Sequence, residues 1–123
     1  MILVFGGAYQ GKTDYAKKEL GARTVCDVSD GGEPDFTKQL ITGLDAFALE
    51  CVRKGTDPVE YFKARKEQWA GCVLVAADIS QGVVPIDPEL RAAREANGRL
   101  LIYLAKEAEQ VHRVFCGIGK RIK

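Results

Sequence analysis

The sequence has little histidine and no closely spaced cysteines. Its one histidine is His112, and its four cysteines are widely separated, at positions 26, 51, 72 and 116. They form no C-x-x-C pair, and their spacing matches neither a disulfide framework nor a zinc site. Each cysteine lies within or beside apolar residues. We therefore expect buried free thiols.

The chain also lacks an excess of either charge and any long apolar run. Eighteen Lys and Arg against 17 Asp and Glu give a net charge of +1, which predicts no attraction to nucleic acid or to an anionic membrane. A membrane-spanning helix needs roughly 20 apolar residues, and no run approaches that length. Because an expected strand starts the sequence, there is no room for a signal peptide, and we expect a cytoplasmic protein. The length of 123 residues suits one domain, 1–123.

The most informative segment is GGAYQGKT at residues 6–13. Gly6, Gly11, Lys12 and Thr13 fit the phosphate-binding pattern G-x-x-x-x-G-K-[ST], the P-loop. The segment follows a short apolar run and precedes a helix-compatible stretch, an order that aims backbone N–H groups and a helix N-terminus at one point. A glycine turn that merely joins a strand to a helix is the alternative. We expect a nucleoside triphosphate, ATP or GTP, to bind here.

Each residue of the motif has an expected role. Lys12 would reach the β- and γ-phosphates and act in catalysis, while the Thr13 hydroxyl would ligate Mg²⁺. The two glycines allow backbone angles and a close approach to phosphate that other residues resist. The complete predicted nucleotide-binding set is Gly6, Gly7, Ala8, Tyr9, Gln10, Gly11, Lys12 and Thr13.

Hydrophobic patterning predicts strands that alternate with helices. Strands are expected at 2–5, 23–28, 72–76 and 111–116, and helices at 12–20, 36–54, 58–69 and 88–109. The ending GIGKRIK can add an edge strand. This order predicts an α/β, P-loop NTPase-like three-layer sandwich with a mainly parallel sheet of about five strands.

The motif does not choose the reaction, which needs an acid near the phosphates. Asp78 is the first candidate, because it follows the strand at 72–76 and ligands bind beyond the carboxyl ends of such strands. There it would act in catalysis by orienting Mg²⁺ or accepting a proton; capping a loop is the alternative. Asp27 and Asp30 come next, although Asp30 beside two glycines suits a turn. Asp45 and Glu50 are expected on a solvated helix face.

Other polar and aromatic residues have plainer interpretations. His112 lies among apolar neighbours and is expected to be a strand residue rather than a nucleophile. Tyr61, Phe62 and Trp69 recur at helical spacing and are expected in a core or an interface. Three arginines on the last helix would either contact phosphate or lie in water, and the sequence does not decide between these: Arg91, Arg94 and Arg99.

Three segments together resemble the bifunctional adenosylcobinamide kinase/adenosylcobinamide-phosphate guanylyltransferase family of cobalamin biosynthesis. They are ILVFGGAYQGKT, DISQGVVPIDPELR and GRLLIYLAKEAEQVHRVFCGIGKRIK, which cover about half the chain. The middle segment has the family's form of an acid followed by glycine, two apolar residues and proline, here Asp78, Gly82, Val83, Val84 and Pro85. The family usually has glutamate at the first of these positions.

The resemblance implies a P-loop α/β fold that uses a triphosphate and Mg²⁺ to phosphorylate the aminopropanol hydroxyl of adenosylcobinamide. It also implies possible assembly as a trimer. The family's second activity, guanylyl transfer, uses a covalent histidine soon after the second strand, and residues 29–71 contain no histidine. This absence argues against guanylyl transfer. The shortened middle of the chain leaves a second hypothesis, a nucleotide-binding accessory or regulatory protein with little turnover. A kinase for an unrelated alcohol is the third.

Overall fold

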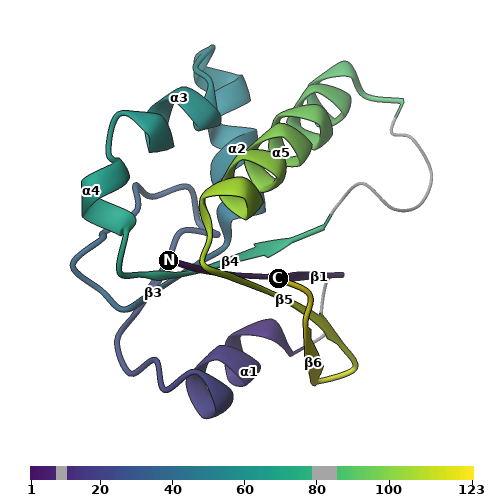
Figure 1. Ribbon diagram of the computed structural model, residues 1–123. Helices are drawn as coiled ribbons and strands as arrows, with labels where there is room; N and C mark the ends of the chain where they lie inside the picture. The colour runs from purple at the N-terminus through teal and green to yellow at the C-terminus, as the bar shows by residue number, and fades with distance from the viewer. Residues whose placement is uncertain (8–10, 79–85) are drawn as a thin grey trace.

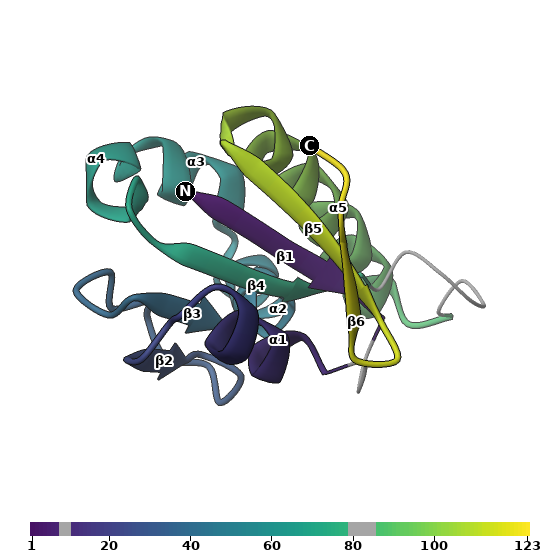
Figure 2. The same ribbon diagram turned by 60° about the horizontal axis from the view of Figure 1, so that its bottom comes forward.

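The computed structural model describes residues 1–7, 11–78 and 86–123, which form one α/β unit (Figure 1). Within these ranges one six-stranded sheet has the order β2-β3-β4-β1-β5-β6. Helix α1 covers one face, and α2, α3 and α5 cover the other (Figures 1 and 2). The α/β class and the mainly parallel sheet are therefore as predicted.

The first strand of the chain lies in the interior of the sheet. β1 (Ile2–Gly6) pairs in parallel with β4 (Val73–Ala77) on one side and with β5 (Gln110–Phe115) on the other. β3 (Leu40–Thr42) and β2 (Val25–Asp27) extend the sheet beyond β4, again in parallel. β6 (Ile118–Arg121) pairs antiparallel with β5. The ending of the chain thus forms the edge strand that the sequence allowed.

The two faces of the sheet bury separate apolar clusters. Alternate residues of β1 divide between them, since Leu3 packs on the side of α5 and Val4 on the side of α1. The larger cluster lies between the sheet and α2 (Leu44–Lys54), α3 (Pro58–Lys63) and α5 (Pro88–Glu107). The smaller lies under α1 (Lys12–Glu19). Burial on both faces explains why β1 and β4 are continuous apolar runs.

The helix expected at 36–54 is wrong in its first part, which contains β3. Leu40 and Ile41 are adjacent in sequence and both fully buried, which fits a strand covered on both faces. The chain then turns at Gly43, which has a φ of 87°, and α2 begins at Leu44. The sheet therefore has six described strands instead of about five.

The helix expected at 58–69 is also interrupted. α3 ends at Lys63 and a short α4 covers Lys66–Trp69. Arg65 leaves the helical conformation; its guanidinium lies 3.7 Å from the ring centre of Tyr61, and its Nη1 donates to the Tyr61 carbonyl. The turn brings the Trp69 indole N–H onto the Phe62 carbonyl at 2.8 Å. Phe62 and Trp69 are core residues, as predicted.

The predicted helix starts are confirmed. Asp57 caps α3 by accepting from the Val59 N–H, and Asp87 caps α5 in the same way from Glu89. The four cysteines are free. Cys51 and Cys72 are buried as expected. Cys26 is only half-buried, and Cys116 is exposed because it lies in the two-residue turn between β5 and β6. Among the described helices, none is long and apolar enough to cross a membrane.

Candidate functional site

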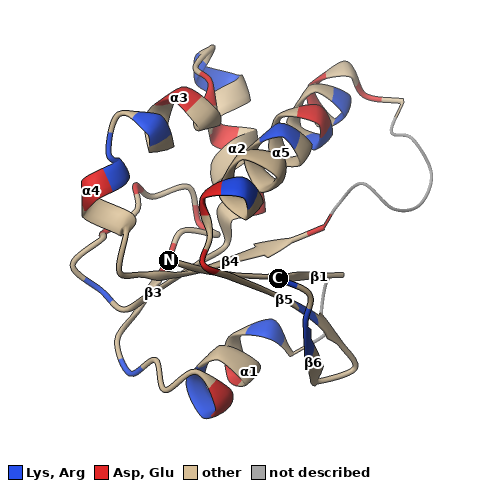
Figure 3. Ribbon diagram, viewed as in Figure 1, with Lys and Arg blue, Asp and Glu red and all other residues tan. Residues whose placement is uncertain are grey.

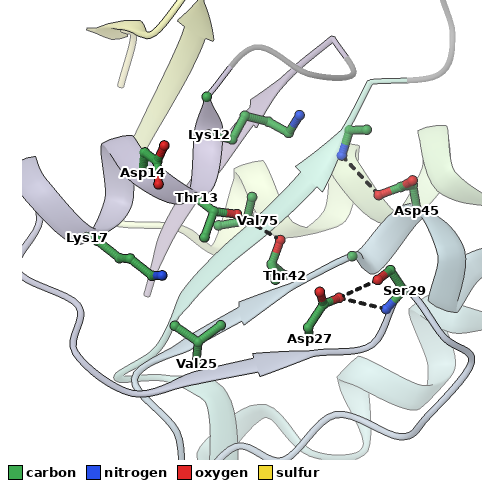
Figure 4. Close-up of a pocket in the computed structure, with 13 residues that line it drawn as sticks. Lys12, Thr13, Asp14, Lys17, Val25, Asp27, Ser29, Thr42, Asp45 and Val75 are labelled. Carbon is green, nitrogen blue, oxygen red and sulfur yellow. Dashed lines mark hydrogen bonds between the residues drawn. The ribbon is translucent and has the colours of Figure 1, made fainter.

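A cavity of about 680 Å³ opens beyond the carboxyl ends of β2, β3 and β4, beside the first turns of α1 and α2 (Figure 4). Its walls combine basic, acidic and hydroxyl side chains with a small apolar floor. The lining residues are Gly11, Lys12, Thr13, Asp14, Lys17, Val25, Asp27, Ser29, Thr42, Gly43, Asp45, Val75 and Ala77. The second half of the P-loop motif therefore lies in a cavity that also contains two carboxylates from other elements.

Two helices begin at this cavity, each after a glycine. Gly11 precedes α1 with φ of 81°, and Gly43 precedes α2 with φ of 87°; neither helix start has a side-chain cap. The first N–H groups of a helix have no partner within the helix and carry partial positive charge. Both starts therefore favour an anion in the cavity.

The Lys12 side chain extends along the cavity. Its ammonium donates to the Gly7 carbonyl at 2.7 Å, across the loop from its own backbone. Burial lowers the pKa of Lys12 from its ordinary value, and the charge of Asp45 opposes this effect. Figure 4 shows Lys12 extending toward the side where Asp45 lies. A partly desolvated ammonium in this position is suited to bind phosphate oxygens.

Two threonine hydroxyls meet at the floor of the cavity. Thr13 Oγ1 lies 3.3 Å from Thr42 Oγ1, so the motif threonine contacts the end of β3. Hydroxyl and carboxylate oxygens are the donors that Mg²⁺ prefers, and Mg²⁺ usually keeps waters and takes its other ligands from phosphate. The described residues contain no cluster of three or more His, Cys, Asp or Glu that could hold a metal. The donor set therefore fits Mg²⁺ carried with a triphosphate rather than a metal held by protein alone.

Two carboxylates line the cavity from β2 and α2, those of Asp27 and Asp45. Asp45 lies in the first turn of α2 and accepts from the Ala77 N–H at 3.2 Å. Asp27 ends β2, and its Oδ1 accepts from both the backbone N–H and the hydroxyl of Ser29, at 2.9 and 2.6 Å. Both side chains are thus held in place by hydrogen bonds. Asp45 was expected on a solvated helix face, and this expectation is wrong because α2 begins one residue before it.

Gly43 allows the end of β2 to approach α2. A Cβ placed at Gly43 would lie 2.7 Å from the Ser29 nitrogen and 3.2 Å from Asp27 Oδ1. Only glycine fits between these atoms with its positive φ. The strand–glycine–helix order at 40–45 parallels the order at 2–13, and this signal was present in the sequence.

Asp78 lies away from this cavity. Its backbone N–H donates to the Gly6 carbonyl at 2.7 Å, but its side chain lines a separate, mostly apolar cavity of about 400 Å³ beside α5. Side chains alternate along β4, so Val75 and Ala77 face the first cavity while the next residue, Asp78, faces the other side. A catalytic role for Asp78 stays a prediction.

The other predicted site residues either have the expected backbone role, lie outside the described residues, or lie away from the cavity. Gly6 ends β1, where an added Cβ would collide with the Val114 carbonyl, and Gly11 has the positive φ expected of it. Ala8, Tyr9 and Gln10 lie outside the described residues. Asp30 is a turn residue that accepts from the Gly32 N–H. Four further candidates do not line the cavity: Glu50, Arg91, Arg94 and Arg99.

His112 is a buried strand residue, as expected. Its Nδ1 lies 2.8 Å from the Tyr15 hydroxyl, and its Nε2 lies 2.9 Å from Gln110 Oε1. Both ring nitrogens are therefore engaged within the sheet and against α1. This arrangement offers no free imidazole nitrogen for covalent chemistry.

The stability of the protein is expected to depend on the protonation of His112. Burial, and secondly the charge of Arg121, lower the pKa of His112 below its ordinary value of 6.5. Below that value the unfolded chain binds the proton more readily, so the free energy of unfolding should fall as pH drops through 6.5 toward the lowered pKa. Urea denaturation over this range measures the effect. His112→Gln should flatten the profile; identical profiles would contradict the assignment.

One residue beside the cavity escaped the sequence analysis. Asn97 on α5 is 1% exposed, and its Nδ2 donates to the Ala77 carbonyl at 3.0 Å. The Ala77 N–H is bonded to Asp45, so side chains from two helices hold the last residue of β4. Strand β3 pairs with β4 only at Val73 and Leu74, which leaves these backbone groups without a strand partner. The sequence did contain a signal for this residue, because Asn97 is a polar residue among the alanines and leucines of an apolar helix face.

Replacing Asn97 with alanine should lower the free energy of unfolding by about 1–3 kcal/mol, because the buried Ala77 carbonyl loses its donor. Urea denaturation gives the value. Asn97→Leu keeps most of the volume, so the difference between the two variants separates the lost hydrogen bond from the created space. An unchanged midpoint in both variants would show that the bond does not stabilise the fold.

Comparisons with known proteins do not place the chain in a family. Neither a protein-family model nor a curated protein matches it. The family resemblance of the sequence therefore stays a prediction, and the function is inferred from the residues of the cavity.

Proposed function

We propose that this protein has a P-loop NTPase fold and is a phosphotransferase that binds ATP or GTP with Mg²⁺ and transfers the γ-phosphoryl group to a hydroxyl. One observation carries the proposal. Lys12 and Thr13 of the motif line the same cavity as Asp27 and Asp45, and two uncapped helix starts open into it. Phosphoryl transfer depends mainly on positioning and charge stabilisation, which these groups supply.

Each group has a role in the proposal. The Lys12 ammonium and the N–H groups at the start of α1 bind the phosphates. Thr13 would hold Mg²⁺, which would supply charge neutralisation on the phosphate oxygens. Asp45 would help to position the metal through hydrogen bonding, since it belongs to the wall toward which Lys12 extends. Asp27, fixed by Ser29, accepts the proton of the attacking hydroxyl.

The acceptor that the sequence resemblance favours is adenosylcobinamide. Only its aminopropanol arm has to enter the cavity, where Asp27 lies on an exposed wall at the end of β2. Guanylyl transfer is not part of the proposal, because the one histidine is buried between Tyr15 and Gln110.

Calorimetric titration with ATP and GTP, each with and without Mg²⁺, tests the first part of the proposal. Mass-spectrometric detection of adenosylcobinamide phosphate tests the second. Tight, Mg²⁺-dependent binding without product from any nucleotide would overturn adenosylcobinamide as the acceptor, leaving the nucleotide-binding accessory protein and the kinase for an unrelated alcohol. Absence of nucleotide binding would overturn both.

Conservative variants separate the three candidate acids. Asp45→Asn and Asp27→Asn should each lower the rate of transfer by about 100-fold or more. Asp78→Asn, in the separate cavity, should leave the rate within a few fold. If Asp78→Asn lowers the rate strongly while Asp45→Asn and Asp27→Asn leave it nearly unchanged, catalysis would be assigned to Asp78, and the roles given to Asp45 and Asp27 would be wrong.

A further inference from the structure

The outer edge of β6 is open. Within the described residues β6 pairs only with β5, and Figure 2 shows no element along its other side. Edge strands present a row of backbone donors and acceptors that can pair with another chain. This edge lies at the opposite end of the sheet from β2, one of the strands whose ends line the proposed nucleotide cavity.

The register of the hairpin identifies the backbone groups that face outward. Phe115 pairs with Ile118 across the two-residue turn of Cys116 and Gly117, whose φ values of 51° and 75° fit a type I′ turn. Ile118 and Lys120 therefore form the hydrogen-bonded pairs with β5, a pattern that continues in the bond from the Ile122 N–H to the Val111 carbonyl. The N–H and C=O groups of Gly119 and Arg121 consequently point away from β5.

Side chains on the α5 side of β6 alternate between apolar and basic. Ile118, Lys120 and Ile122 follow one another on this face, and Ile118 and Ile122 are 75% and 55% exposed. Phe115, opposite Ile118, is 65% exposed. These apolar residues and two basic ones line a groove of about 570 Å³ along the hairpin. The groove therefore offers two apolar positions with a positive charge between them.

The positive charge of this groove has no counter-charge within the part of the chain described. Arg113 and Lys120 lie directly opposite each other on β5 and β6, and neither forms an ion pair there. Figure 3 shows basic and no acidic residues on β6. The cavity beside α5, which shares Ile122 with this groove, is lined by one carboxylate, Asp78. Like charges directly opposite in a sheet are unfavourable, so an acidic side chain between them would stabilise the pair.

We propose that the β6 edge binds an extended segment of a partner protein in which an acidic residue is flanked, two positions away on each side, by apolar residues. The segment adds a seventh strand through the outward groups of Gly119 and Arg121. Its apolar side chains lie beside Ile118 and Ile122, and its carboxylate lies beside Lys120. A second copy of this chain is disfavoured, because the antiparallel register that pairs Gly119 with Arg121 across two copies of β6 would place Lys120 opposite Lys120.

Solution NMR with ¹⁵N-labelled protein tests the proposal. The probe is a capped heptapeptide with two isoleucines two positions on either side of a central glutamate and threonine elsewhere. Its matched control has lysine in place of the glutamate. Saturable shifts and slower hydrogen exchange are expected at the Gly119 and Arg121 amides, with the glutamate peptide binding at least about fivefold more tightly. Equal affinity of the two peptides, shifts centred elsewhere, or no saturable shift at millimolar peptide would each overturn the proposal.

Two protein variants complete the test. Lys120→Glu should reverse the preference, so that the lysine peptide binds more tightly than the glutamate peptide. Arg121→Pro removes an outward N–H without removing a ladder bond to β5, and should abolish binding while the hairpin keeps its chemical shifts. Analytical ultracentrifugation of the peptide-free protein tests whether a second copy of this chain binds the β6 edge instead. A concentration-dependent dimer that competes with the peptide would assign the edge to a second copy and overturn the proposal.

Discussion

Replacing Lys12 with alanine is expected to weaken binding of ATP or GTP by about 100-fold. In the proposed complex the ammonium would make charge-assisted hydrogen bonds to phosphate, which contribute about 1.5–3 kcal/mol each, and a loss near 2.8 kcal/mol corresponds to two decades in affinity. Lys12 is half-buried at the first position of α1, so solvent screens its charge less than that of an exposed lysine. Calorimetry in the presence of Mg²⁺ measures the change.

Lys17 provides the matched control, because it lines the same cavity from the same helix but is exposed. Lys17→Ala removes an equal charge and should weaken binding by only a few fold, as expected for a screened surface charge. If both variants lose affinity equally, the summed positive charge of the cavity attracts the nucleotide, and Lys12 makes no specific contact with its phosphates. If neither loses affinity, the nucleotide binds elsewhere.

Replacing Gly43 with alanine is expected to lower the free energy of unfolding by about 3 kcal/mol. About 1 kcal/mol comes from the positive φ, and about 2 kcal/mol from overpacking against the Ser29 nitrogen and Asp27 Oδ1. The new methyl group would also displace the turn that fixes Asp27, so transfer activity should fall in the fraction that remains folded. Urea denaturation gives the stability, and the transfer assay gives the activity.

Gly55→Ala separates the two contributions to that loss. Gly55 ends α2 with φ of 72°, and an added Cβ there meets no atom within 4 Å. This variant should therefore cost only the backbone contribution, about 1 kcal/mol, with unchanged activity. Equal losses at Gly43 and Gly55 would contradict the close contact between α2 and the Asp27 turn.

Hydrophobic patterning predicted most elements of the fold but failed where the spacing of apolar residues fits both a helix and a strand followed by a helix. Leu40 and Leu44 are spaced like one face of a helix, and both are buried, yet they belong to β3 and α2. Ile41, next to Leu40, is also buried. A one-sided helix does not explain the burial of two adjacent residues, whereas a strand covered on both faces does. Arg65 shows a different limit, because it leaves the helical conformation between α3 and α4, and hydrophobic periodicity does not encode such a break.

The sequence predicted which motif residues line the candidate cavity, but it predicted the residues from other elements incompletely. The motif placed Lys12 and Thr13 in the cavity, because its residues are consecutive in sequence. Asp45 and Thr42 reach the same cavity from another strand–helix unit, and their placement depended on finding β3. For Asp78, position at the end of a strand was known, but the face on which its side chain lies depends on a register of one residue.

The central place of β1 has a consequence for synthesis of the chain. Its neighbours in the sheet start at Val73 and Gln110, so β1 lacks one partner until Val73, and the other until Gln110, has left the ribosome. Pairings of such long sequence separation form slowly. Until β5 has been made, one edge of β1 stays unpaired. The proposed nucleotide site therefore forms late, and a nascent chain stalled before Gln110 should be bound by chaperones and unable to bind nucleotide.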